Sequence, residues 1–183
     1  FLNNGRNRID ASVFNVEHKG TRLIGRSSEL LWGLRYQHEV IEDKLSEWRT
    51  IDSAGYVSPY SPTEINLIDV IKTKINLQTN RVQGYVQYTY SKQLRDSSVF
   101  SATGGIRANY WDFNKQTVFS PRVTLSYKPN WKQDMLFKAS YGYYYQPPFY
   151  REMRGFDGKL NPNIKAQQSI HYLLSADYNF KLW

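Results

Sequence analysis

The chain has 183 residues with a formal net charge of +8, and 16% of its residues are aromatic. No apolar run approaches the ~20 residues that a membrane-spanning helix requires, so a helical membrane protein is excluded. The chain has no cysteine, which excludes disulfides and cysteine-based metal sites. Its basic residues stand singly rather than in blocks, so we expect no nucleic-acid partner.

Seven segments alternate apolar and polar residues and are separated by clusters of Gly, Pro, Asn and Asp, which predicts β-strands. In chain order these segments are residues 6–17, 29–40, 74–90, 98–111, 117–128, 134–146 and 166–180. No segment shows a convincing helical period, and no linker or domain boundary is evident. The sequence therefore predicts an all-β antiparallel fold in one domain, residues 1–183.

In strands two to seven, one of the two faces contains no charged residue. In the strand 98–111, for example, every second residue from Phe100 to Tyr110 is apolar or small. The other members of this charge-free face are Leu30, Trp32, Leu34, Tyr36, Val82, Gly84, Val86, Tyr88, Tyr90, Val123, Leu125, Tyr127, Met135, Phe137, Ala139, Tyr141, Tyr143, Ile170, Tyr172, Leu174, Ala176, Tyr178 and Phe180. An Arg facing lipid at the bilayer midplane costs roughly 2–4 kcal/mol, so this sorting is expected of a transmembrane β-barrel wall.

The opposite face carries the charges. Its charged or titratable members include Arg35, Glu39, Arg81, Arg107, Arg122, Lys138, His171 and Asp177. The first strand is ambiguous, because Ile9, Ala11 and Val13 compete with Phe14 and Val16 for the apolar face.

The connections between the strands differ in length in a regular way. We expect short connections at 18–28, 91–97 and 129–133, a modest one at 112–116, and long ones at 41–73 and 147–165. Outer-membrane barrels have short periplasmic turns and longer outside loops, so the even-numbered strands are predicted to run outward. The aromatic residues then fall near two rims: Tyr88, Tyr90, Tyr127, Tyr178, Phe180 and Trp131 at the periplasmic one, and Tyr36, Tyr110, Trp111, Tyr141 and Tyr143 at the outer one.

Several stretches carry, in their order and spacing, a resemblance that covers most of the chain. They are LLWGLRYQHE (30–39), EWRTIDSAGY (47–56), RVQGYVQYTY (81–90), TGGIRANYW (103–111), SPRVTLSYKP (120–129), ASYGYYYQPPFYREMR (139–154) and LNPNIKAQQSIHYLLSADYNF (160–180). Together they resemble the barrel domain of TonB-dependent outer-membrane receptors, in the form common in Bacteroides-like bacteria. The resemblance implies an antiparallel transmembrane β-barrel of about 22 strands, of which this chain would supply about seven.

The resemblance also implies a function and partners. Such receptors actively take up a nutrient, such as an iron chelate, cobalamin or an oligosaccharide, across the bacterial outer membrane. The implied partners are outer-membrane lipid, the receptor's own plug domain and remaining barrel strands, the TonB complex through the N-terminal part, and a surface lipoprotein. No cofactor and no enzymatic activity are expected. The sequence matches neither the plug nor the TonB-contacting segment and shows no signal peptide, so we expect an internal segment of a larger protein.

Two other classes remain open at this point. A soluble lipocalin-like barrel or sandwich that binds an apolar ligand would turn Trp32, Ile106, Leu125 and Leu174 inward. An outer-membrane enzyme would need a catalytic constellation, but the acidic residues of the predicted loops lack a matched base or nucleophile. The three histidines do not have the spacing of metal ligands, so no metal site is expected.

The best candidate for ligand binding is the long outside loop 146–165, which places aromatic side chains beside Arg. The residues expected to contact a substrate are Phe149, Tyr150, Arg151, Glu152, Arg154 and Phe156. The alternative is a rigid, self-packed loop in which Pro147 and Pro148 fix a turn. A second long loop, 41–73, could contribute to the mouth of a pocket through Trp48, Asp52, Tyr56 and Tyr60.

Four basic residues of the charged face form a second candidate set. Arg35, Arg107, Arg122 and Lys138 are expected to face the lumen, where they would guide an anionic solute or pair with the plug. The alternative is that they pair along the wall with acidic neighbours such as Glu39 and Asp177.

Overall fold

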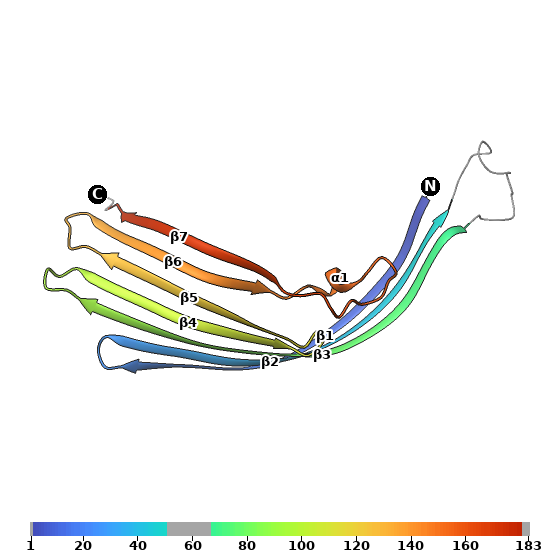
Figure 1. The fold of residues 1–183 in the computed structure, drawn as a ribbon, viewed down its shortest axis with the longest axis horizontal. Coiled ribbons are helices and arrows are strands. Elements are labelled where there is room, and N and C mark those ends of the chain that lie inside the picture. The colour runs from blue at the N-terminus through green and yellow to red at the C-terminus, as the bar shows by residue number, and fades with distance from the viewer. Residues whose placement is uncertain (1, 51–66, 181–183) are drawn as a thin grey trace. The chain divides into compact units, whose positions relative to one another are not determined.

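The computed structural model describes residues 2–50 and 67–180, in which the chain forms seven strands and one helical turn (Figure 1). They are β1 (Leu2–Ile24), β2 (Ser28–Thr50), β3 (Leu67–Gln93), β4 (Val99–Trp111), β5 (Gln116–Lys128), β6 (Asp134–Gln146), α1 (Tyr150–Met153) and β7 (Gln167–Asn179). The strands form one sheet in the order of the sequence, and the pairs from β3 to β7 are antiparallel. The prediction of a seven-stranded, antiparallel all-β fold is confirmed.

The chain divides into two compact units, and β1, β2 and β3 contribute to both. The seven-strand unit comprises Asn15–Gln37, Asn80–Pro148 and Lys165–Trp183, so it contains part of every strand. The three-strand unit comprises Phe1–Phe14, His38–Thr79 and Phe149–Ile164. The helical turn α1 and the loop that follows it therefore belong to the three-strand unit.

In the seven-strand unit, residues of the predicted charge-free face lie opposite one another on neighbouring strands. Val86 pairs with Ile106, and Gly104 pairs with Val123. Tyr141 on β6 pairs with Tyr172 on β7. Because successive side chains of a strand point to opposite sides, this register places the predicted residues of β3 to β7 on one side of the sheet. The predicted sorting of these strands is confirmed.

The charge-free face is largely exposed. Ile106 and Leu125, on the middle strands β4 and β5, each keep 44% of their surface exposed, and Leu174 on β7 keeps 85%. Among the described residues of the seven-strand unit, the buried hydrophobic side chains are Trp111 and Val118, and both lie on the opposite side of the sheet. A soluble barrel or sandwich would bury Ile106, Leu125 and Leu174. The exposure of these side chains contradicts that alternative.

The structure resolves the ambiguous face of the first strand near its middle. The guanidinium of Arg35 donates to Asn15 Oδ1 at 2.9 Å, so Asn15 lies on the charged face. Gly20 lies against the ring of Trp32, a member of the charge-free face, and a Cβ at position 20 would overlap that ring. By alternation, Val16 lies on the charge-free face, as the second of the two predicted registers requires.

The first three strands are longer than predicted. The expected connection 18–28 is wrong, because β1 continues to Ile24 and a turn of residues 25–27, with Gly25 at a φ of 67°, leads into β2. The expected loop 41–73 is also wrong, because β2 extends to Thr50 and β3 begins at Leu67. Charged residues near position 43 interrupt the apolar alternation, but backbone pairing between strands does not depend on apolar side chains.

The remaining boundaries agree closely with prediction. The strand β6 spans the predicted residues 134–146. β4 and β5 differ from prediction by one residue at their first end, and β7 by one residue at each end. The turns 25–27, 94–98 and 129–133 lie at one end of the seven-strand unit, on the left of Figure 1. The connection 112–115 at the other end is as short as these turns, so the predicted alternation of lengths holds only in part.

The predicted placement of Trp111 on an aromatic rim is wrong. Trp111 pairs with Arg81 across β3 and β4 and therefore lies on the charged face. Its side chain is 4% exposed, and the Arg81 guanidinium carbon lies 4.1 Å from the centre of its ring. Trp111 follows Tyr110 at the end of β4, and residues adjacent in a strand cannot share a face. The placement of the other aromatic residues near the two rims of the barrel stays a prediction.

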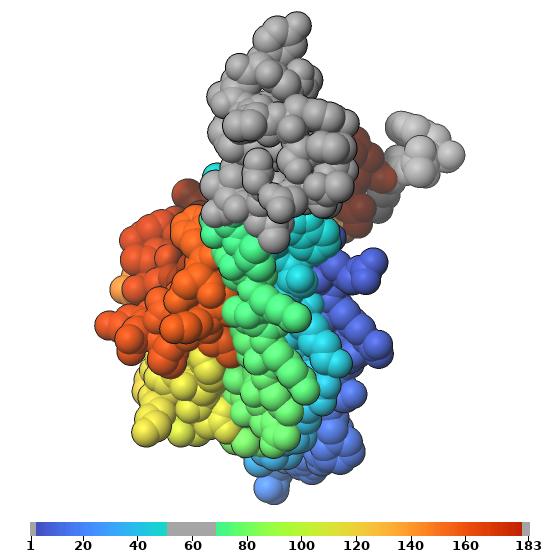
Figure 2. Space-filling model, turned by 90° about the vertical axis from the view of Figure 1, so that its right-hand side faces the viewer, coloured from blue at the N-terminus to red at the C-terminus, as the bar shows by residue number. Residues whose placement is uncertain are grey.

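The three-strand unit has a small core under the loop that follows β6. Figure 2 shows residues 149–164, in orange, packed beside the green beginning of β3. The buried hydrophobic side chains described in this unit are Leu45, Leu77 and Met153. A Cβ at Gly158 would come within 3.0 Å of Thr73 Oγ1, so the loop backbone approaches β3 closely. The extended part of β3 is therefore covered by this loop.

Candidate functional site

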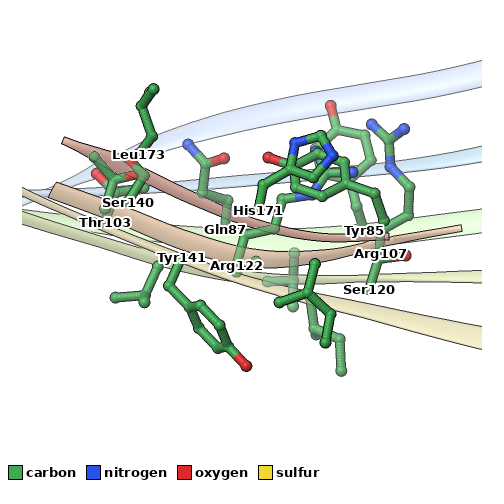
Figure 3. A pocket seen from close by; sticks show the side chains of 18 of the residues that line it. Tyr85, Gln87, Thr103, Arg107, Ser120, Arg122, Ser140, Tyr141, His171 and Leu173 are labelled. Carbon is green, nitrogen blue, oxygen red and sulfur yellow. The ribbon is translucent and has the colours of Figure 1, made fainter. Parts of the chain in front are cut away.

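The charged face of the seven-strand unit forms a hollow of about 850 Å³ (Figure 3). Its polar lining comes from β3 to β7 and consists of Tyr85, Gln87, Thr103, Arg107, Ser120, Arg122, Thr124, Ser140, Tyr144 and His171. The lining also includes residues of the charge-free face, namely Val86, Ile106, Val123, Tyr141, Ile170 and Tyr172. In Figure 3 the ring of Tyr141 points to the opposite side of the sheet. The lining contains two arginines and a histidine and no acidic residue, so its charge favours an anion.

Arg122 is held over its neighbouring strand by an aromatic ring. It pairs with Gly142 on β6, and a Cβ at Gly142 would lie 2.9 Å from Arg122 Cγ. Because glycine leaves this space empty, the guanidinium carbon reaches to 4.1 Å from the centre of the Tyr144 ring. Tyr144 in turn stacks on His171, with 4.3 Å between ring centres and 26° between planes. These three side chains form a cation–aromatic cluster across three strands.

Arg107 is held in the opposite direction. Its guanidinium carbon lies 5.6 Å from the centre of the Tyr85 ring on β3. Tyr85 lies flat over Gly33 of β2, where a Cβ would overlap the ring. Neither Arg107 nor Arg122 has a carboxylate within ion-pair distance among the described residues. Two unneutralised guanidinium groups therefore face the hollow.

The two other basic residues of the predicted lumen set have partners of their own. Lys138 Nζ lies 2.8 Å from Asp177 Oδ2, which is the pairing along the wall that the alternative interpretation expected. Arg35 donates to Asn15 Oδ1 at 2.9 Å and to Gln37 Oε1 at 3.1 Å. The four basic residues thus share the charged face. Among the described residues, Lys138 has an acidic partner, Arg35 has two amide partners, and Arg107 and Arg122 contact aromatic rings.

Short hydroxyl side chains occupy the charged face beside the hollow. Thr89 and Thr103 approach to 3.0 Å, Ser91 and Ser101 to 2.8 Å, and Thr124 and Ser140 to 2.9 Å between hydroxyl oxygens. Each contact joins neighbouring strands. In these cross-strand pairs, short hydroxyl side chains satisfy one another's hydrogen bonds. No long side chain therefore projects from this part of the charged face. Their alternate spacing is visible in the sequence, but nothing local shows that they meet in pairs.

The predicted substrate loop is fastened to β2 by one buried carboxylate. Asp43 is fully buried, and its Oδ2 accepts a hydrogen bond from the Tyr150 hydroxyl at 2.8 Å and one from Arg154 Nη1 at 3.0 Å. Burial, followed by the hydrogen bond to Asp43, raises the pKa of Tyr150 well above its ordinary value. Sequence reasoning did not single out Asp43, because nothing local distinguishes it from its charged neighbours.

The six predicted contact residues of this loop divide into two groups. Tyr150 and Arg154 point to Asp43, and Glu152 Oε2 accepts from the Phe149 amide at 2.9 Å. Phe149 and Phe156 are 62% and 102% exposed, and Arg151 is also exposed. Bonds within the loop, including Asn161 N to Met153 O at 2.8 Å, support the self-packed alternative for its base. The exposed residues remain accessible to a ligand.

The family of this chain is identified by its match to a known protein family. The sequence matches the family described as TonB dependent receptor-like, beta-barrel over residues 2–183. The chain belongs to this TonB-dependent receptor family. No match was found among curated proteins or among solved structures.

Membership places this TonB-dependent receptor barrel in the bacterial outer membrane, in a family of transporters rather than enzymes. It also implies contacts with the membrane, a plug domain and TonB in general terms. The soluble alternative is wrong on this ground as well as on the exposed charge-free face. No helix among residues 2–50 and 67–180 is long and apolar enough to cross a membrane.

Of the other predicted residues of this receptor barrel, the structure describes only one. Trp48 lies within β2, whereas Asp52, Tyr56 and Tyr60 lie outside the described residues. In the part of the chain that the structure describes, no three His, Asp or Glu side chains are grouped so that they could hold a metal ion. Among the described residues, the hollow and the loop therefore hold the predicted site residues whose contacts can be followed.

Proposed function

We propose that this chain is a wall segment, with its outer loops, of a receptor for active uptake of a nutrient too large for simple pores. The nutrient is an iron chelate, cobalamin or an oligosaccharide, and the receptor is of the Bacteroides-like form. The observation that carries the proposal is the charge-free face that runs in register across β3 to β7. In this family, such a face meets lipid and the charged face meets the lumen.

In this proposal the loop 146–165 contacts the nutrient through its exposed residues. Phe149 and Phe156 supply apolar surface, and Arg151 supplies a charge. Tyr150 and Arg154 act as positioning residues, because their bonds to Asp43 hold the base of the loop on β2. Glu152 closes the first turn of α1.

The proposed partners follow from the same arrangement. The charged face, with Arg35, Arg107, Arg122 and Lys138, lines a lumen that holds the receptor's own plug, and further strands continue the sheet beyond β1 and β7. The N-terminal part of the receptor contacts the TonB complex. A surface lipoprotein covers the outer loops.

The proposal is tested by uptake measurements in cells that carry the full-length receptor gene or its deletion. Ferric siderophore, cyanocobalamin and a maltooligosaccharide are supplied separately as labelled probes, and the deletion is expected to abolish uptake of one of them. Replacing Phe149, Arg151 and Phe156 by Ala should lower that uptake at least tenfold, whereas Arg95→Ala, in the turn 94–98, should not. Wild-type uptake of all three probes by the deletion strain would contradict this nutrient set.

A further inference from the structure

We propose that Arg6, Arg8, Lys44, Lys72 and Lys74 form a binding surface for an anionic glycan, which rests on the proposed function in that this part of the receptor must lie at the cell surface. All five side chains are exposed and belong to the three-strand unit. They lie on one side of its strands, which we call the basic face. The glycan is a chain of sugars that carry carboxylate or phosphate groups.

On β2, the basic face is opposite to the side that anchors the loop 149–164. Asp43, which binds this loop, and Leu45 are both buried. Lys44 stands between them in the strand and is exposed. Because successive side chains of a strand point to opposite sides, Lys44 points away from the loop.

On β3, two lysines take the same side. Thr73 lies against the loop, since a Cβ at Gly158 would come within 3.0 Å of its Oγ1. Leu77, which shares the alternation of Thr73, is buried. Lys72 and Lys74 flank Thr73 in the strand and are exposed, so they point away from the loop.

On β1, two arginines take this side as well. A Cβ at Gly5 would lie 3.6 Å from Glu47 Cγ of β2, and Asn7 Nδ2 donates to Glu47 Oε1 at 3.4 Å. By alternation along β2, Glu47 lies on the side that anchors the loop. Arg6 and Arg8 alternate with these two β1 residues and therefore lie on the basic face.

The basic face is neither the proposed lumen wall nor a surface in hydrocarbon. Along β2, Lys44 shares the alternation of Tyr36 on the charge-free face, whereas Arg35 of the predicted lumen set has the opposite one. An Arg or Lys that faces lipid at the bilayer midplane costs about 2–4 kcal/mol, so a face with five of them requires water.

Acidic side chains neutralise only part of the basic face. Arg8 Nε lies 2.9 Å from Asp10 Oδ2, and both side chains stay more than half exposed. Among the described residues, no ion pair involves the other four, which are Arg6, Lys44, Lys72 and Lys74. The excess of positive charge attracts an anion.

The residues around these charges favour a glycan over a protein. The neighbours of Lys44 along its strand on this face are Glu42 and Ser46, and Lys74 is followed there by Asn76. The cores of protein interfaces are depleted of Lys and enriched in aromatic residues. Lysines instead suit phosphate and carboxylate groups, which they bind as point charges.

The charges are spread over three strands and not gathered in a pocket. Residues on one face of a strand repeat at about 7 Å, and neighbouring strands lie about 4.8 Å apart. A single small anion or lipid headgroup can therefore meet only a few of these charges. A glycan with an acidic group on each sugar meets several at once, and multivalency strengthens its binding.

The test uses the full-length receptor in phosphatidylcholine vesicles. Polygalacturonate, an acidic glycan, and dextran, a neutral one, are the soluble probes, and titration calorimetry at low salt measures their binding. The test variant is Lys44→Gln, Lys72→Gln, Lys74→Gln, and a second variant replaces the same lysines by Arg. The control loses as many charges in the turns of the seven-strand unit, by Arg26→Gln, Arg95→Gln and Lys132→Gln.

The wild type, the control and the Arg variant should bind polygalacturonate and not dextran. The triple Gln variant should bind polygalacturonate at least tenfold more weakly. Equal binding by the triple Gln variant and the control overturns the surface, and so does a wild type that does not distinguish the two probes.

A lipid headgroup as the partner gives a different result. Adding phosphatidylglycerol to the vesicles would then raise the urea midpoint of the wild type and the control but not that of the triple Gln variant. This result, without binding of polygalacturonate, overturns the glycan as the ligand.

Failure of this surface can be distinguished from failure of the proposed function. Asn76 is exposed on the basic face, and Asn130 is exposed in the turn 129–133. In intact cells, an impermeant maleimide should label Asn76→Cys and not Asn130→Cys. If this pattern is found and the triple Gln variant binds like the control, the glycan surface is wrong while the placement of the wall stands. Without labelling of Asn76→Cys, the unit is not at the cell surface and both proposals fail.

Discussion

Asp43 and Arg154 are separated by 111 residues in the sequence and form an ion pair of 3.0 Å in which the carboxylate is fully buried. Arg154 retains only 16% exposure of its side chain. The pair joins the strand β2 to the end of α1 within the three-strand unit. It gives the loop 149–164 a fixed base from which Phe149 and Phe156 project.

Replacing Asp43 by Asn should release the loop 149–164. The change leaves the Arg154 charge nearly buried and without its counter-ion, so the free energy of opening the loop should fall by about 3 kcal/mol. Hydrogen exchange of the loop amides, measured by mass spectrometry on the full receptor, should accelerate by about two orders of magnitude. Asp10→Asn removes an exposed pair with Arg8 and should leave the exchange unchanged.

Titration of Tyr150 should occur at higher pH than that of an ordinary tyrosine. Because its pKa is raised in the folded state, its hydrogen bond to Asp43 contributes fully to stability below pH ~10 and is lost only as pH rises through the raised value. The absorbance of the wild type and of the Tyr150→Phe variant is titrated with pH. The difference between the two curves isolates the ionisation of the Tyr150 phenol. A difference curve with an ordinary midpoint near pH 10 would show that the bond is not formed.

Adding a methyl group at Gly142 should disrupt the cluster of Arg122, Tyr144 and His171. The new Cβ would meet Arg122 Cγ at 2.9 Å, close to the backbone, so the arginine must move. Overpacking of this kind costs about 1–3 kcal/mol, measurable by urea unfolding of the receptor in vesicles. Gly104→Ala is the matched control, because a Cβ there meets nothing within 4 Å. Equal stability of the two variants would contradict the close packing at position 142.

A charge should be tolerated on one face of β5 and not on the other. Leu125→Arg places a guanidinium on the charge-free face and should destabilise the receptor in lipid by about 2–4 kcal/mol if the position lies near the midplane. Ser126→Arg, on the adjacent residue, points to the charged face and should cost far less. The amount of each variant in purified outer membranes and its urea midpoint in vesicles test the contrast. Comparable losses for both variants would mean that neither face is in lipid.

Local sequence pattern was sufficient for the strands and their faces. The alternation around Ile106 and Leu125 predicted which residues would share one side, because successive side chains of a strand must point in opposite directions. The same rule, applied across the end of β4, would have moved Trp111 to the charged face. The lengths of β2 and β3 could not be predicted, because backbone pairing continues where the apolar alternation is interrupted.

The sequence by itself determined the charge-free face of this receptor barrel, since a period of two is a local property of the strand. Only the tertiary structure decided which basic residues have partners. Lys138 meets the carboxylate of Asp177, Arg35 meets the amide of Asn15, and Arg107 and Arg122 have no described acidic partner, because strand register brings together residues from different strands. It also decided that Asp43 anchors the loop 149–164, since this contact depends on how distant segments meet and not on the residues around it.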